Sequence, residues 1–104
     1  MKEITVQELK KLQDEGADFQ LIDVREPVEF EEANLGGELI PLGEFMEDID
    51  AATENISKDK QVIVHCRSGK RSANAIMMME MQKDYDNLYN LTGGIMAYID
   101  EIGL

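Results

Sequence analysis

Short apolar runs alternate with helix-like patterns along the chain. Residues 61–66 form an apolar, β-branched run, which is typical of a central parallel strand buried on both faces. Residues 19–24 also read as a strand, and the shorter runs at 39–41 and 88–91 are expected to be strands as well. Strands that alternate with helices predict an α/β fold, in which helices cover both faces of a parallel sheet.

Helical patterns fill the intervals between these runs. Thr5 and Glu8 form a capping box that begins a first helix, expected to end near Gly16. Further helices are expected at 27–32, 45–52, 72–83 and 94–102. The pattern at 72–83 is apolar nearly all round, which predicts a largely buried helix. We interpret its methionines as core packing rather than as a soft-metal site, because no thiolate or imidazole accompanies them.

Length and cysteine content restrict the kind of protein. A chain of 104 residues without repeats or linkers is expected to form one domain over residues 1–104. The single cysteine excludes an intramolecular disulfide and favours a reducing compartment. Because the N-terminal residues have no apolar signal-like run, we expect a cytoplasmic protein.

The charge is strongly acidic but unevenly distributed. With 10 basic and 22 acidic residues the net charge is −12, which argues against nucleic acid or an anionic membrane as a partner. No acidic residue lies between Lys60 and Glu80, whereas two of the three arginines, Arg67 and Arg71, do, with Lys70 beside them. The sequence therefore predicts one basic place on an acidic protein.

This basic place directly follows the central strand. Active sites of parallel sheets lie beyond the carboxyl ends of the strands, and Cys66 is at such an end. Cations and the amides of a turn entering a helix would lower the pKa of the thiol and bind an anion. Gly69 suits a position with positive φ, and Ser72 is expected to cap the helix. We therefore interpret Cys66 as a thiolate nucleophile rather than an inert buried cysteine; the anion-binding candidates are Arg67, Ser68, Gly69, Lys70, Arg71 and Ser72.

Other polar residues at this edge are interpreted as structural. His65 precedes the cysteine, but neighbouring residues of a strand point to opposite faces, so we expect His65 to lie away from the site. Asp23 and Arg25 follow the strand at 19–24 and are candidates for substrate binding. We favour a structural role, in which Asp23 anchors the edge loops by ion pairing.

Three motifs in order resemble the rhodanese-like (sulfurtransferase) family, especially its single-domain members. Residues 65–73, His-Cys-Arg-Ser-Gly-Lys-Arg-Ser-Ala, resemble the family's active-site loop and following helix. Residues 23–30 resemble its upstream motif, and residues 91–98 its C-terminal Gly-Gly segment. The chain departs from the family at residues 33–38, where Gly-His-Ile-Pro-Gly-Ala is common, and at Tyr98, where Trp is usual.

The resemblance implies a three-layer fold with a sheet of about five strands, and a persulfide mechanism. Cys66 would attack thiosulfate or a similar small anionic donor, release sulfite and hold the sulfur as a persulfide. An acceptor would then take the sulfur: cyanide in an assay, and a thiol or a carrier protein in the cell. No cofactor, metal ion or general base is implied.

Two other functions stay open at this point. A cysteine-dependent phosphatase or arsenate reductase shares the strand–loop–helix arrangement, but phosphatases have five residues between Cys and Arg, and here only four separate Cys66 from Arg71. The other is a persulfide-carrying or docking module with little activity on free thiosulfate, whose acidic surface would recognise a basic partner.

Overall fold

The structure is a computed structural model that describes residues 1–104. The strands are β1 (Lys2–Ile4), β2 (Phe19–Asp23), β3 (Glu38–Leu39), β4 (Gln61–His65) and β5 (Leu88–Leu91). The helices are α1 (Val6–Asp14), α2 (Pro27–Glu32), α3 (Leu42–Glu47), α4 (Ile49–Ala52), α5 (Lys70–Lys83) and α6 (Gly94–Glu101).

All five strands form one parallel sheet in the order β1-β5-β4-β2-β3. The central strand β4 pairs with β2 over its whole length, from Phe19 opposite Gln61 to Asp23 opposite His65. On its other side β4 pairs with β5, where Val64 lies opposite Asn90. The carboxyl ends of β2, β4 and β5 therefore meet at one edge of the sheet.

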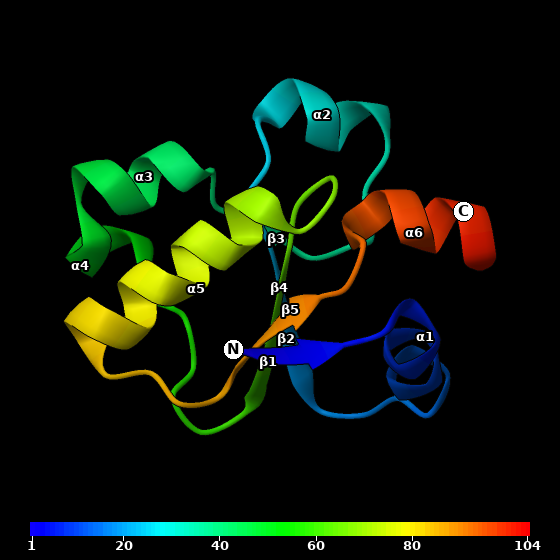
Figure 1. The fold of residues 1–104 in the computed structure, drawn as a ribbon, viewed down its shortest axis with the longest axis horizontal. Helices are drawn as coiled ribbons and strands as arrows, with labels where there is room; N and C mark the ends of the chain where they lie inside the picture. Colours follow the sequence, from blue (N-terminus) through cyan, green and yellow to red (C-terminus); the bar gives the residue numbers. More distant parts are fainter.

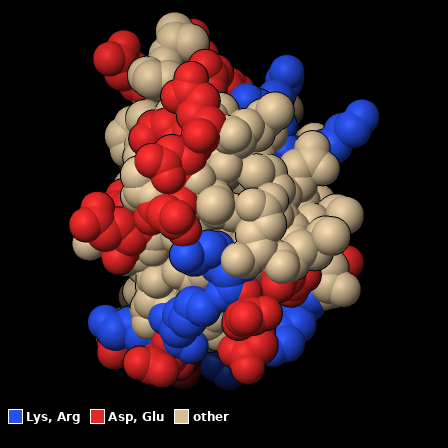
Figure 2. All heavy atoms as spheres, turned by 90° about the vertical axis from the view of Figure 1, so that its left-hand side faces the viewer, with Lys and Arg blue, Asp and Glu red and all other residues tan.

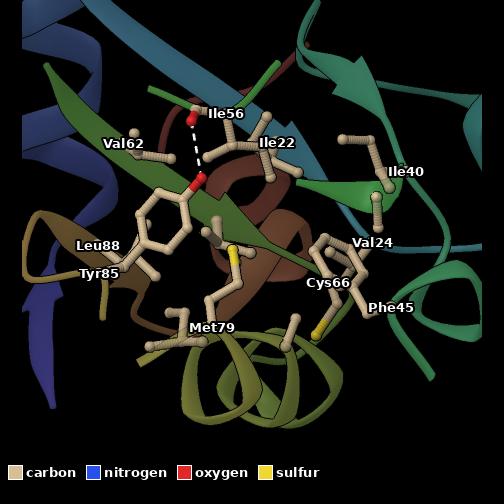
Figure 3. Packing of buried hydrophobic residues seen from close by; sticks show 14 residues of the cluster. Ile22, Val24, Ile40, Phe45, Ile56, Val62, Cys66, Met79, Tyr85 and Leu88 are labelled. Carbon is tan, nitrogen blue, oxygen red and sulfur yellow. Dashed lines mark hydrogen bonds between the residues drawn. The ribbon is translucent and has the colours of Figure 1, made fainter. Parts of the chain in front are cut away.

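Helices cover both faces of the sheet, as Figure 1 shows, with α3, α4 and α5 on one side and α1 and α6 on the other. Each face has its own core. The core under α5 contains alternate residues of β4 together with Cys66, Phe45 and Met79 (Figure 3). In the same core the hydroxyl of Tyr85 donates to the carbonyl oxygen of Ile56 at 2.8 Å. The predicted α/β fold, with a five-stranded parallel sheet between two helical layers, is confirmed.

Local sequence signals position several elements. The hydroxyl of Thr5 accepts from the amide of Glu8, and the Glu8 carboxylate accepts from the amide of Thr5, so the predicted capping box is present at α1. Pro27 begins α2, where its missing N–H costs no hydrogen bond. None of the helices is both long enough and apolar enough to span a bilayer.

The structure corrects the sequence prediction for three elements. Residues 45–52 do not form one helix, because Asp48 adopts an extended backbone (φ −153°) and caps α4 by accepting from the amide of Ala51. Strand β1 was not predicted. The third correction concerns α5, which begins at Lys70 rather than at Ser72, since Gly69 takes the capping position.

Helix α5 is also less buried than predicted. Its buried residues are Ser72, Ala75, Ile76 and Met79. Met77 and Met81 are 50% and 79% exposed, so their thioethers lie at the surface rather than in the core. With Met46 of α3, which is 70% exposed, they line a groove between α3 and α5.

Candidate active site

Strand β4 delivers Cys66 to the carboxyl edge of the sheet, between the ends of β2 and β5. A loop of three residues, Arg67 to Gly69, then leads directly into α5. The cysteine is free, and only 1% of its surface is exposed. The end of β4 before the cysteine is buried, and Ser72 in the first turn of α5 is buried as well, so the sulfur lies between two packed elements.

Hydrogen-bond donors converge on the sulfur of Cys66. The amide of Gly69 donates to Sγ at 3.1 Å and the amide of Ser72 at 3.4 Å. The Ser72 hydroxyl oxygen also lies 3.4 Å from Sγ. Gly69 has φ +107°, a backbone conformation that residues other than glycine rarely adopt, so the tight turn between Cys66 and α5 favours glycine here. The arrangement is suited to a negatively charged sulfur.

The pKa of the Cys66 thiol is set by two opposing effects. Burial acts to raise this pKa, whereas the Ser72 hydroxyl and the backbone amides of Ser72, Gly69 and Ser68 lower it, and the result is a pKa below the ordinary value. Because these donors are uncharged, hydrogen bonds rather than cations dominate the effect. The sequence predicted that loop cations and backbone amides together lower this pKa, whereas the groups that lower it in the structure are the amides and the Ser72 hydroxyl.

The basic residues of the loop and of the first turn of α5 have different environments. Arg71 makes two hydrogen bonds to the carboxylate of Glu29 in α2, at 2.7 and 2.9 Å. This guanidinium holds the pKa of Glu29 at about 2. Arg67 and Lys70 are exposed. Arg67 lines a pocket that α2 and α6 complete, with Glu32 of α2 on its wall. Of the three cations, Arg67 and Lys70 are thus the ones free to meet an incoming anion.

Helix α6 supports the loop through backbone hydrogen bonds. Its first amides donate to the loop's carbonyls: the amide of Ile95 to the oxygen of Cys66 at 2.9 Å, and that of Met96 to the oxygen of Arg67 at 3.1 Å. This approach requires glycine, because a Cβ on Gly94 would lie 2.4 Å from the Arg67 oxygen, and Gly94 also has φ +60°. This contact between the Gly-Gly segment and the loop was not predicted from the sequence.

Asp23, Arg25 and His65 lie beside the loop, and Asp23 and Arg25 form a buried ion pair. Arg25 donates to both carboxylate oxygens of Asp23 and to the backbone oxygens of Glu29 and Ala33, which links the end of β2 to the middle and the C-cap of α2. This agrees with the ion-pairing role expected of Asp23. His65 is fully buried, and its closest charged partner is Asp23, at 3.8 Å.

The His65 ring is not placed to act as a base. Burial is the main effect that lowers the pKa of His65, which favours the neutral imidazole. Alternation along β4 puts this side chain on the face opposite Cys66. The histidine therefore lies away from the sulfur, as the strand geometry predicted.

Sequence reasoning missed Asn90. This residue of β5 is 7% exposed, and its carboxamide joins two parts of the loop: Oδ1 accepts from the Ser72 hydroxyl at 2.6 Å, and Nδ2 donates to the oxygen of Gly69 at 3.0 Å. A polar residue within an apolar strand was the available signal, because a buried amide needs partners. No group of three or more histidine, cysteine, aspartate or glutamate side chains is placed to hold a metal ion.

Comparison with known proteins adds independent information. The family described as "Rhodanese-like domain" matches residues 5–101. A sulfurtransferase of Allochromatium vinosum is 33% identical over 99 residues, covering 94% of this chain and 88% of that protein. The chloroplastic rhodanese-like/PpiC domain-containing protein 12 of Arabidopsis thaliana is 39% identical over 102 residues, covering 94% of this chain but 34% of that protein.

A solved structure agrees with these matches. The rhodanese-like domain protein from Staphylococcus aureus has a TM-score of 0.78 and 27% identity, covering 98% of this chain and 95% of that one. The chain spans only 34%, 27% and 25% of the length of three curated relatives, which are longer proteins. The family match and the shared fold show that this chain belongs to the rhodanese-like domain family and is homologous to small sulfurtransferases.

Proposed function

We propose that this protein transfers a sulfane sulfur from thiosulfate, or a similar small anionic donor, to a thiophilic acceptor through a persulfide on Cys66. The observation that carries the proposal is the set of hydrogen-bond donors aimed at one sulfur atom at the carboxyl end of β4. Donors fixed in this way stabilise negative charge on sulfur in each state of the reaction where it develops.

The transfer consists of two displacements. The Cys66 thiolate attacks the outer sulfur of thiosulfate; a new S–S bond forms, the old one breaks, and sulfite leaves with the bonding electron pair. The acceptor then attacks the terminal sulfur of the persulfide, and the Cys66 thiolate leaves with the electron pair of that S–S bond. The lowered pKa of the Cys66 thiol favours the thiolate that makes the first attack.

The loop residues have separate parts in this proposal. Arg67 and Lys70, both exposed, attract the anionic donor. The amides of Ser68, Gly69 and Ser72 stabilise the negative charge on sulfur by donating hydrogen bonds to it. Arg71 orients the loop from its ion pair with α2 rather than binding the donor directly, which revises the part first assigned to it.

Two features favour sulfur transfer over phosphate hydrolysis. Four residues rather than five separate Cys66 from Arg71, and the guanidinium that a phosphatase would offer to phosphate is held by Glu29.

A second candidate is a persulfide-carrying module with little activity on free thiosulfate. It is favoured by the longer relatives, in which the matched region is a quarter to a third of the protein. A carrier would pass its sulfur to a partner protein, and the net charge of −12 fits a basic partner. A lone thiol of this kind is also suited to a reducing compartment such as the cytoplasm.

Steady-state assays separate these functions. With thiosulfate and cyanide, the wild type is expected to form thiocyanate and the Cys66→Ser variant to form none, because a serine hydroxyl is not ionised at neutral pH. With p-nitrophenyl phosphate, the two proteins are expected to be equally inactive. Cysteine-dependent phosphate hydrolysis would overturn the proposal. A wild type that accepts sulfur but forms thiocyanate no faster than the variant would favour the carrier.

A further inference from the structure

The Ser72 hydroxyl lies between two acceptors. Its oxygen is 3.4 Å from the sulfur of Cys66 and 2.6 Å from Oδ1 of Asn90. A serine hydroxyl has a single proton, so it can donate to one of these atoms at a time. Both Ser72 and Asn90 are buried, so water does not supply the missing donor.

The orientation of the Asn90 amide is fixed by its other contact. The carbonyl oxygen of Gly69 can only accept, so the atom facing it at 3.0 Å is Nδ2, and the oxygen Oδ1 faces Ser72. The short contact between Oδ1 and the hydroxyl oxygen therefore contains the hydroxyl proton. In this state the hydroxyl presents only its lone pairs, and no proton, to the sulfur of Cys66. This arrangement suits a protonated thiol, which can donate its own S–H to the hydroxyl oxygen.

Ionisation of the cysteine removes that S–H. Two electron-rich atoms then face each other at 3.4 Å unless the hydroxyl proton turns toward sulfur. Turning the proton satisfies the thiolate but leaves Oδ1 of Asn90 without a donor in a buried place. The Asn90 carbonyl therefore competes with the thiolate for the Ser72 proton.

We propose that Asn90 is a positioning residue, which holds the Ser72 hydroxyl proton while Cys66 is uncharged and releases it to sulfur when the thiolate forms. The hydroxyl keeps its proton throughout, and only the acceptor of its hydrogen bond changes. Resting on the proposed function, the same exchange takes place in each displacement: the proton turns to sulfur as the thiolate leaves the persulfide, and returns to Asn90 when Cys66 is again bonded to a second sulfur.

Few charged groups surround this hydroxyl–amide pair. Arg67 lies in the loop and is exposed, and Lys70 and Arg71 lie with Ser72 in α5, where Lys70 is exposed and Arg71 is paired with Glu29 of α2. Glu3 of β1 lies opposite Asn90 in the sheet, and its carboxylate accepts from the Thr92 hydroxyl at 3.1 Å. None of these groups is hydrogen-bonded to the hydroxyl or to the amide, so the exchange depends on the pair itself.

The test is a double-mutant cycle read by the pH dependence of iodoacetamide alkylation of Cys66, which requires no sulfur donor. Asn90→Leu keeps the approximate shape but removes both the acceptor and the contact with Gly69. The Asn90→Leu substitution is made in the wild type and in a Ser72→Ala background. The hydrogen bond to Gly69 is lost equally in both. The difference between the two shifts therefore isolates the competition for the proton.

We expect Ser72→Ala to raise the alkylation midpoint. Asn90→Leu should lower the midpoint in the wild type, relative to its effect in the Ser72→Ala background, by about half a pH unit or more, roughly a threefold change in the ionisation constant. Equal shifts in both backgrounds, or a difference of opposite sign, would show that Asn90 only anchors the loop and would overturn the proposal.

A second substitution keeps the test decisive if the leucine variant does not fold. Asn90→Asp retains an acceptor and strengthens it, so it should raise the midpoint more in the wild type than in the Ser72→Ala background; equal rises would overturn the proposal. Far-ultraviolet circular dichroism checks the fold of each variant. Because alkylation is independent of sulfur transfer, a protein that fails to accept sulfur from thiosulfate would refute the proposed function and leave this result intact.

Discussion

At the scale of single residues, the sulfur of Cys66 is surrounded by neutral donors. Its lowered pKa follows from hydrogen bonds of Ser72, Gly69 and Ser68 that outweigh the effect of burial. Neutral donors in a buried site act over short distances and are little affected by salt, in contrast to exposed cations. The chemistry of the thiol therefore depends on the position of a few atoms rather than on the number of nearby charges.

This distinction predicts the effect of removing each kind of group. Arg67→Ala and His65→Ala should shift the midpoint of Cys66 alkylation by less than Ser72→Ala does, because neither side chain donates to the sulfur. The three midpoints are measured at the same ionic strength. A shift for Arg67→Ala that exceeds the one for Ser72→Ala would show that cations, not hydrogen bonds, control the thiol.

The Glu29–Arg71 ion pair makes a second prediction at this scale. The pKa of Glu29 falls from 4.5 to about 2 in the folded protein, so its ionised form stabilises the fold above pH 4.5, and this contribution is lost as the pH falls toward 2. Glu29→Gln should lower the free energy of unfolding at pH 7 by about 1 kcal/mol, because the pair is partly exposed and screened.

Urea unfolding of both proteins between pH 7 and pH 2 measures this difference. It should be constant down to about pH 5 and then shrink toward zero near pH 2. The matched control is Glu31→Gln, on the same helix and exposed, which should change stability little at any pH. A difference that persists at pH 2 would mean that the Glu29 carboxylate stabilises the fold by something other than its charge.

At the scale of elements, three neighbours hold the loop after β4 and the start of α5. Helix α2 holds it through the ion pair, β5 through Asn90, and α6 through amides that donate to the carbonyls of Cys66 and Arg67. The last contact is the closest, because the backbone of Gly94 lies directly against the loop. A change in the position of α6 should therefore change the pKa of the Cys66 thiol.

Gly94→Ala tests this coupling. The new Cβ would lie 2.4 Å from the Arg67 oxygen, and the residue has a positive φ, so we expect a loss of about 2 kcal/mol or more in stability and a raised alkylation midpoint of Cys66. Gly43→Ala, in α3 with nothing within 4 Å, is the control and should be neutral or slightly stabilising. Unfolding and alkylation measure both effects. Unchanged alkylation in a folded Gly94→Ala protein would exclude α6 as a support of the loop.

The same scale shows why part of the structure was predictable. Long apolar runs, a capping box and Pro27 are local signals, and the elements that depend on them were predicted. Strand β1 has three residues, two of them charged, and exists because it pairs with β5, 87 positions away. Pairing between strands so far apart in the sequence cannot be recognised from the local pattern of apolar and polar residues.

The contacts of the site were harder to predict than its residues. The cysteine and its loop are contiguous in sequence, so they could be named. The roles of Glu29, Asn90 and Gly94 depend on packing across separate elements, and spacing in the sequence does not contain that information. Arg71 illustrates the difference, because its side chain faces Glu29 through an ion pair that links residues 42 positions apart.

At the scale of the whole molecule, charge is distributed unevenly. Figure 2 shows the face formed by α3, α4 and α5, where acidic side chains lie along one side of a continuous uncharged area. The exposed methionines of α3 and α5 contribute to the groove on this face. The net charge of −12 repels anions at long range, so the exposed Arg67 and Lys70 matter more for attracting a donor than they would on a neutral protein.

The most direct test of the persulfide mechanism is intact-protein mass spectrometry after incubation with thiosulfate. The wild type should gain about 32 Da, the mass of one sulfur atom held as a persulfide, and cyanide should remove it. Cys66→Ser, treated in the same way, should gain nothing. The absence of this adduct on the wild type, or its appearance on Cys66→Ser, would contradict a mechanism in which Cys66 carries the transferred sulfur.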